Sequence, residues 1–266
     1  MMRAEKTQKG NPHKLTVNQH IFPRASMDRF ATSGGVHVRR LDHSDNIMFG
    51  TDNPYFCARR VWDHKTEHGL MVEIENKYQD TAEQIASGSV RTLSTHMNES
   101  VTDLYLIWQL RFNRYLNPIS DTLLKGVEPD RNLSKNSQEV LESKGVVFMK
   151  PEGTVPGRFM AGIGISIAMD RERNRMKKTK WGILTSDDVE FIVPDNFLRY
   201  SIVPLSPTVC LAAEMRDQRV GVEQVATING LAIQGSHRYY FARDLSQCPV
   251  IRPIPLNLRA YFLSQR

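Results

Sequence analysis

The spacing of apolar residues predicts two helices in the middle of the chain. In residues 71–87 apolar side chains recur every three or four positions among acidic ones, which is typical of an amphipathic helix. Residues 101–116 are apolar on most sides, which indicates a buried helix. Asn98 or Ser100 can cap its start, and Asn117-Pro118 ends it. Residues 119–143 are expected to be helical or mixed.

Short apolar runs predict strands on both sides of these helices. Residues 36–41 alternate between two faces, as a half-exposed strand does. Residues 182–184 and 191–193 flank a turn at residues 186–188 and predict a hairpin that stops at Pro194. A further strand is expected to start at 145–149, and strands or strand–helix joints are expected at 200–203, 208–213, 224–228 and 238–242. The pattern predicts an α+β fold, with a central helical segment and strands at both ends forming a mixed or antiparallel sheet.

Breaker residues suggest how the chain is divided. Residues 1–14 are polar and basic and contain Gly10-Asn11-Pro12, so they are expected to form a flexible lead-in. Residues 15–266 are predicted to form a single α+β domain, with a helical half at 70–145 and a β half at 180–245. The Gly- and Pro-rich stretch 151–164 is predicted to be a linker between the halves or a loop over the core.

Composition agrees with a globular protein that has a real core. The chain has 266 residues, of which 40% are apolar and 24% charged. No apolar run approaches the roughly 18 residues of a membrane span, so a cytoplasmic protein without membrane contact is expected. Cys57, Cys210 and Cys248 are widely separated and favour buried, reduced thiols over a disulfide or a zinc site.

The charge is unevenly distributed. The formal net charge is +6, and residues 1–40 carry eight basic residues against two acids. A second basic run at 171–180, which includes Lys177 and Lys178, has six basic residues and one acid. Both patches could follow a phosphate backbone and so favour nucleic acid as a partner. The alternative is that they are a solvated tail and a solvated helix face.

Several motifs in order along residues 15–242 resemble a bacterial family known as domain of unknown function 4238. The resemblance implies which positions matter but carries no established activity. In this chain Pro194-Asp195-Asn196-Phe197 stands where that family usually has Ser-Asp-Asn-Pro. The motifs are Gln19-His20-x-x-Pro23-Arg24 with Phe30, Arg60-Val61-Trp62, the acids of residues 73–83, Gln109-x-Arg111, Phe191-Ile192-x-x-Asp195-Asn196, residues 204–207 and Arg238-Tyr239-Tyr240.

The main functional hypothesis is a nuclease-like hydrolase, such as an antiphage-defence or toxin-type effector. Its catalytic groups would be His20, Glu75 or Glu83, and Asp195. His20, Glu75 and Asp195 would hold Mg²⁺ or Mn²⁺, which would lower the pKa of a bound water. Basic and amide side chains would bind the substrate phosphates, and these are Arg24, Arg111, Asn196, Lys177 and Lys178.

Other interpretations remain open. In a structural one, His20 bonds a backbone group, Arg111 pairs with Glu75, and Asp195 caps a turn. Arg91 and His96 have the Arg-x4-His spacing that looks like the motif of helical HEPN ribonucleases, which are metal-free. His64 and His68 could bind a transition metal from one helix face. The chain could instead be a non-catalytic basic protein that binds nucleic acid or another protein. The sequence leaves the oligomeric state open.

Overall fold

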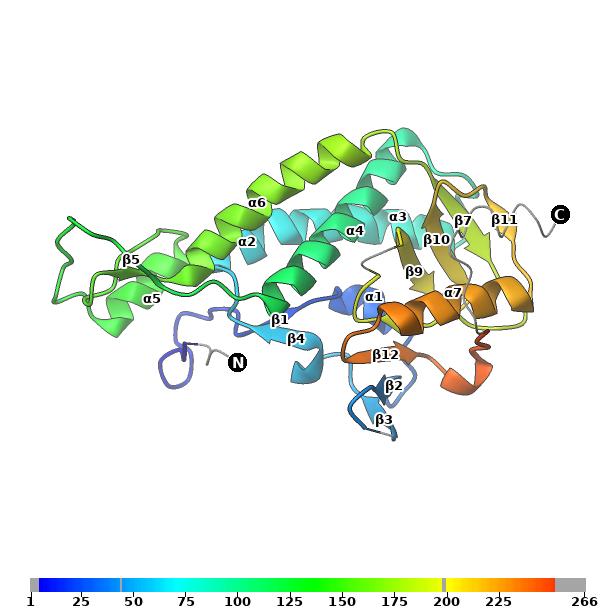
Figure 1. Ribbon diagram of the computed structural model, residues 1–266, viewed down its shortest axis with the longest axis horizontal. Helices are drawn as coiled ribbons and strands as arrows, with labels where there is room; N and C mark the ends of the chain where they lie inside the picture. Colours follow the sequence, from blue (N-terminus) through cyan, green and yellow to red (C-terminus); the bar gives the residue numbers. More distant parts are fainter. Residues whose placement is uncertain (1–4, 44, 198–199, 252–266) are drawn as a thin grey trace.

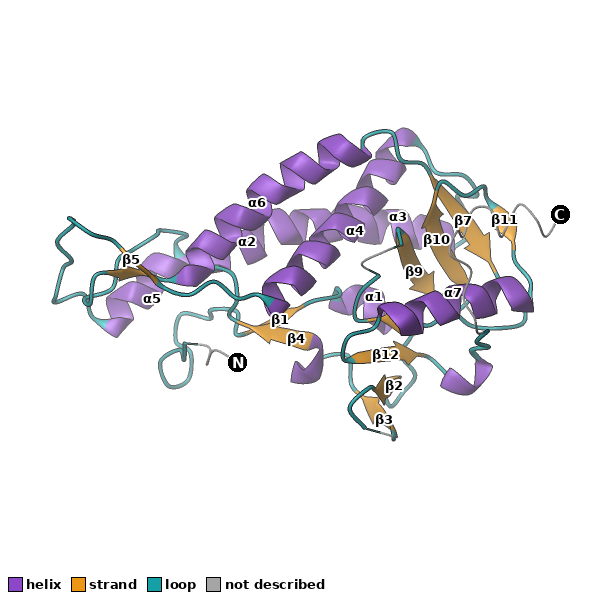
Figure 2. Cartoon of the chain, in the orientation of Figure 1, coloured by secondary structure: helices purple, strands orange, loops and turns teal. Residues whose placement is uncertain are grey.

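The computed structural model describes residues 5–43, 45–197 and 200–251. It has the predicted α+β fold, with helices packed in the centre and strands contributed by both ends of the chain (Figures 1 and 2). The helices are α1 (Arg24–Asp28), α2 (His64–Thr66), α3 (Val72–Ala86), α4 (Thr95–Leu116), α5 (Lys135–Ser143), α6 (Gly157–Met176) and α7 (Val222–Gly235). A π-helical turn, Glu67–Met71, joins α2 to α3.

Within the described ranges, the strands form two sheets of four strands and two shorter ribbons. One sheet has the order β3-β2-β12-β8, and the other has the order β11-β7-β10-β9. The first sheet is antiparallel, and the second is mixed because β11 runs parallel to β7. The ribbons are β1-β4 and β5-β6. The strand bounds are β1 Asn18–His20, β2 Val36–Arg40, β3 Asn46–Phe49, β4 Cys57–Arg59, β5 Thr122–Leu123, β6 Thr154–Val155, β7 Trp181–Thr185, β8 Val193–Pro194, β9 Ile202–Ser206, β10 Val209–Ala213, β11 Gln218–Arg219 and β12 Tyr239–Ala242.

The two predicted central helices are confirmed as α3 and α4. Helix α3 buries Ile74, Tyr78 and Ile85 on one face, as the periodicity requires. Helix α4 is buried on most sides, but it begins earlier than predicted. The Ser94 side chain caps it by accepting a hydrogen bond from the Met97 amide. Asn98 therefore lies inside the helix, where its side-chain oxygen accepts from the Trp181 amide at the start of β7.

The prediction of a linker or loop over residues 151–164 is wrong in its second half, because α6 starts at Gly157. Two glycines are used for close packing between chain segments. A Cβ on Gly157 would lie 1.9 Å from the Ile119 carbonyl oxygen, and one on Gly162 would lie 1.8 Å from Asp63 Oδ2. The glycines that suggest a break in the sequence therefore let a helix lie against its neighbours.

Three strand predictions are also corrected. Strand β7 pairs with β10 and β11, so it forms no hairpin with the run at 191–193. That run reaches β8, which pairs with β12. Residues 224–228 belong to α7, because a short apolar run does not by itself distinguish a strand from a buried helix. Residues 145–149 form no strand.

The described part of the predicted lead-in, residues 5–14, makes long-range contacts that the sequence did not suggest. The Gln8 amide donates to Glu139 Oε1 of α5 at 2.8 Å, and Glu5 is ion-paired. All three cysteines are free and buried, as predicted. In the described ranges, none of the helices combines the length and apolar character of a membrane span.

Candidate functional site

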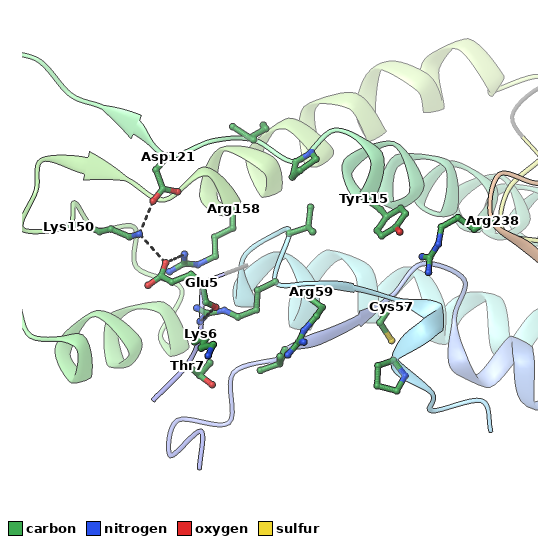
Figure 3. Close-up of a pocket in the computed structure, with 16 residues that line it drawn as sticks. Glu5, Lys6, Thr7, Cys57, Arg59, Tyr115, Asp121, Lys150, Arg158 and Arg238 are labelled. Carbon is green, nitrogen blue, oxygen red and sulfur yellow. Dashed lines mark hydrogen bonds and ion pairs between the residues drawn. The ribbon is translucent and has the colours of Figure 1, made fainter. Parts of the chain in front are cut away.

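A cavity of about 1250 Å³ opens where the β1-β4 ribbon, the end of α4 and the start of α6 meet (Figure 3). Its lining is strongly basic, with six cationic side chains against two carboxylates. The cations are Lys6, Arg59, Arg60, Lys150, Arg158 and Arg238, and the carboxylates are Glu5 and Asp121. Such a surplus inside a concavity concentrates a positive potential and attracts anions.

One end of the cavity, here called the tyrosine end, is formed by Cys57, Tyr115 and Arg238. The Arg238 guanidinium lies 4.5 Å from the ring centroid of Tyr55 and 5.0 Å from that of Tyr115. These cation–π contacts orient the guanidinium without neutralising its charge. Among the described residues, no carboxylate forms an ion pair with Arg238, so its charge remains available to a ligand.

Asp195 fixes the backbone that carries Arg238. Its carboxylate accepts hydrogen bonds from the amides of His237 (2.8 Å) and Arg238 (2.7 Å). Its carbonyl oxygen accepts from Trp108 Nε1 at 2.9 Å, which ties the same turn to α4. Burial raises the pKa of Asp195, although the two amide hydrogen bonds oppose the shift. Asp195 is 1% exposed and acts on the cavity through Arg238.

Arg59 lies between the two ends of the cavity in Figure 3. It is the last residue of β4 and is exposed, and its register partner on β1 is Asn18. Within the described residues it has no ion-pair partner. The ribbon therefore presents a second unneutralised guanidinium to the cavity, and Arg is suited to bidentate contacts with phosphate.

The opposite end, here called the arm end, is formed by Glu5, Asp121, Lys150 and Arg158. Behind it, Glu142 of α5 accepts hydrogen bonds from Arg158 Nη2 (2.7 Å) and Arg60 Nη2 (2.6 Å). Burial alone would lower the pKa of Arg158, but the hydrogen bonds and charge of Glu142 raise it above its usual range. The cations of this end are thus paired with carboxylates.

His20 lies beside the cavity, next to a buried ion pair. The β1-β4 register places His20 opposite Cys57, and opposed residues in an antiparallel pair share a face. His20 Nε2 lies 2.9 Å from the Thr51 carbonyl oxygen. Since a carbonyl only accepts, Nε2 carries the proton and Nδ1 has the lone pair. Burial lowers the pKa of His20, and the charge of Glu75 opposes that shift.

Glu75 and Arg111 form the ion pair next to His20, with Oε1 and Nη1 2.5 Å apart. The Arg111 guanidinium also lies over the Trp62 ring, 5.9 Å from its centroid, and its Nε donates to Met71 Sδ. Met71 ends the π-helical turn that leads into α3. The structural interpretation of the pair and of the His20 contact is therefore confirmed, and Arg111 is only 1% exposed.

The other predicted site residues do not converge on His20. Glu83 is exposed and lies eight residues beyond Glu75 on α3, a rise of about 12 Å. Asn196 is fully buried and donates to the Gly235 carbonyl, so it is placed to support a turn rather than a substrate. Arg24 starts α1 and is exposed, within electrostatic reach of His20.

Lys177 and Lys178 follow the end of α6 and are exposed. Lys177 borders a separate hollow of about 290 Å³, which is also lined by Glu99 and Asp103. The basic run 171–180 is partly neutralised, because Arg173 pairs with Asp103 and Arg175 with Glu172. This run is thus distinct from the cavity.

The side chains predicted to hold Mg²⁺ or Mn²⁺ have other partners. Glu75 faces Arg111, Asp195 faces backbone amides, and His20 Nε2 faces a carbonyl. Across the described residues, no three His, Cys, Asp or Glu side chains are grouped to hold a metal ion. The predicted donors do not fit the ion in this arrangement. His64 and His68 stack with ring centroids 4.1 Å apart, without a third ligand in those residues.

Sequence reasoning missed most of the cavity. Arg59, Lys150 and Arg158 were not predicted, and Arg238 entered only through the family resemblance. The one local indication of a basic site was the adjacent pair Arg59-Arg60, which shortly precedes Trp62. The Arg158 and Glu5 side chains meet across 153 residues of sequence, so no spacing could reveal them.

Comparisons with known proteins identified no relative of this chain. No family model matches the sequence, and neither a curated protein nor a solved structure matches it. The resemblance to domain of unknown function 4238 therefore stays a prediction, and function has to be argued from the site itself.

Proposed function

We propose that the cavity binds a single-stranded nucleic acid through its phosphate groups. The observation that carries this proposal is the pair of guanidinium groups, on Arg59 and Arg238, that face the cavity without a carboxylate partner in the described residues. Such guanidinium groups remain free to form charge-assisted, bidentate hydrogen bonds with phosphate oxygens. Phosphodiesters supply anions at regular spacing along a strand.

The size and lining of the cavity favour a strand over a small metabolite. Its volume of about 1250 Å³ exceeds the range of about 300–1,000 Å³ that is usual for small-molecule pockets. Proteins that bind single strands combine a basic groove with aromatic rings and arginines that stack on bases. Tyr115 and Arg238 provide one ring and one guanidinium at the tyrosine end.

The test is a titration with a labelled single-stranded oligonucleotide of about 12 nucleotides, repeated over a range of salt. Affinity should fall steeply with salt. Arg59→Ala should weaken binding and reduce the slope of log K against log salt by about 0.7, the value for one phosphate contact on a single strand. A flat salt response would remove the proposal.

Lys178→Ala is the matched control, because it removes one positive charge from the basic run outside the cavity. It should leave affinity close to that of the unmodified chain. Equal losses in Arg59→Ala and Lys178→Ala would mean that overall charge, rather than the cavity, binds the strand. A duplex of the same sequence serves as a second ligand and should bind more weakly.

Hydrolysis of the bound strand is the second candidate function, and the His20 tautomer favours it. A neutral imidazole whose Nε2 is fixed by the Thr51 carbonyl presents Nδ1 as a base. Incubation of the oligonucleotide with the protein should then give cleavage that His20→Ala abolishes and that His43→Ala, at an exposed histidine outside the cavity lining, retains. Cleavage with and without EDTA would separate a metal-free reaction from one that needs Mg²⁺ or Mn²⁺. Retained cleavage in His20→Ala would exclude this role.

A further inference from the structure

An acidic side chain of the protein itself already occupies part of the basic cavity. In residues 5–14, here called the N-terminal strap, Glu5, Lys6 and Thr7 line the cavity, and the Glu5 carboxylate lies at the arm end (Figure 3). Glu5 Oε2 lies 2.6 Å from Arg158 Nη1 and 3.1 Å from Lys150 Nζ, and Oε1 accepts from Lys135 Nζ. Three cations thus surround one carboxylate.

Polar contacts attach the strap to the rest of the protein. None of its residues is buried, and the first buried apolar side chain that follows is Leu15. Besides Glu5, the main attachments are hydrogen bonds from the Gln8 amide and side chain to Glu139 and from Arg60 Nη1 to the Glu5 carbonyl. Water can replace such contacts at small cost. An anion that competes for the same cations can therefore detach the strap.

The chemistry around Glu5 is that of a phosphate site. An arginine fork and two ammonium groups bind a phosphate group as readily as a carboxylate. Glu5 carries a single charge on two oxygens, whereas a terminal phosphate offers more charge and a third oxygen. The arm end also lies in the same cavity as Arg59 and Arg238, which the proposed strand would contact.

We propose that Lys135, Lys150 and Arg158 form a phosphate subsite of the cavity, that Glu5 occupies it as an internal ligand, and that a terminal phosphate of the bound strand displaces Glu5 and releases the strap. This inference rests on the proposed function. The strap then lowers the affinity of the resting protein for the strand. Weakly charged anions do not displace Glu5.

The first experiment compares affinities for the labelled oligonucleotide carrying a 5′-phosphate. Glu5→Gln removes the competing charge and should bind about two- to fivefold more tightly, the range that one partly exposed ion pair represents. Glu223→Gln, on the exposed first turn of α7, makes the same change of net charge far from the cavity and should bind as the unmodified chain does. Unchanged or weaker binding by Glu5→Gln would overturn the inference.

The second experiment measures amide hydrogen exchange in the intact chain. Addition of the oligonucleotide should speed exchange at the Gln8 amide, because that amide loses its hydrogen bond to Glu139 of α5, while a bound ligand ordinarily slows exchange nearby. Slower or unchanged exchange in the strap would show that Glu5 stays in place and that the inference is wrong.

These outcomes are distinguishable from failure of the proposed function. If the unmodified chain and Glu5→Gln both fail to bind the strand, the proposed function falls and the inference falls with it. If the chain binds, Arg59→Ala weakens binding and Glu5→Gln leaves it unchanged, only the displacement of Glu5 is refuted.

Discussion

The arm end and the tyrosine end of the cavity are both basic, but their cations are satisfied in different ways. At the arm end, Arg158 shares Glu142 with Arg60 and also pairs with Glu5. At the tyrosine end, Arg238 lies against two aromatic rings and, in the described residues, has no carboxylate partner. The Glu142 pairs behind the arm end therefore form a structural network, whereas Arg238 at the tyrosine end keeps its charge free for an anion.

Because the cations have different partners, some of them are expected to contribute mainly to stability and others mainly to ligand binding. A buried ion pair is costly to break, because removing one partner leaves an uncompensated charge. A guanidinium that rests on an exposed aromatic face contributes less to stability, about 0.5–1 kcal/mol. Substitution of Glu142 should therefore change mainly stability, and substitution of Arg238 mainly binding.

The largest expected effect is on stability, from Glu142→Gln. This change leaves Arg60 and Arg158 without their shared carboxylate, and all three side chains are at most 6% exposed. The free energy of unfolding should fall by about 3–5 kcal/mol, as for a broken buried pair. Urea denaturation followed by circular dichroism would measure it.

Arg238→Ala is the matched substitution at the tyrosine end. It should lower the free energy of unfolding by about 1–2 kcal/mol at most, from two cation–π contacts, yet weaken oligonucleotide binding. If Arg238→Ala destabilises the fold as much as Glu142→Gln does, the distinction between the two ends is wrong.

An effect smaller than that of Glu142→Gln is expected from Asp195→Asn, which tests the role given to Asp195. The amide side chain can accept from only one of the His237 and Arg238 amides, so unfolding should become easier by about 1–3 kcal/mol. Affinity for the oligonucleotide should fall as well, because Arg238 is no longer held in position.

A double-mutant cycle tests whether Asp195 acts through Arg238. In an Arg238→Ala background, Asp195→Asn should cause little further loss of affinity, so the two losses should not add. Additive losses would mean that Asp195 affects binding by another route, such as direct contact with the ligand.

Elements with a regular spacing of apolar residues could be predicted from the sequence. Contacts between residues far apart in the sequence could not. Helices α3 and α4 follow from spacing alone, since Ile74, Tyr78 and Ile85 recur at helical intervals. Helix α6 was missed because Gly157 and Gly162 suggest a loop. Only the fold shows why glycine is needed at these positions: a Cβ there would collide with Ile119 or Asp63.

The same limit applies to the site. The pairing of Glu75 with Arg111 was among the interpretations of the sequence, because α3 and α4 are neighbours along the chain. The cavity network was not, because Arg60 and Glu142 are 82 residues apart and Glu5 comes from a segment predicted to be flexible. Charge partners of this kind are set by the tertiary fold and leave no periodic pattern.

The smallest expected effect is a pH dependence at Glu5, and it tests whether the arm end holds that carboxylate as a charge. Burial would raise the pKa of Glu5, but the charge of Arg158 and the hydrogen bond and charge of Lys135 lower it from its ordinary 4.5 to about 2. Because the folded-state pKa is the lower one, the stabilisation is complete above the ordinary value and is lost as the pH falls towards about 2.

Glu5→Gln cannot titrate at this position, so the melting temperatures of the two proteins should report the charge directly. The unmodified chain should melt higher by a constant amount from about pH 7 to about pH 5, and the difference should shrink steadily at lower pH. Arg238 has no carboxylate partner in the described residues, so Arg238→Ala should not change the pH dependence. A gap between the chain and Glu5→Gln that persists at low pH would mean that shape, rather than charge, holds Glu5 at the arm end, and the contrast between the two ends would then lose its electrostatic basis.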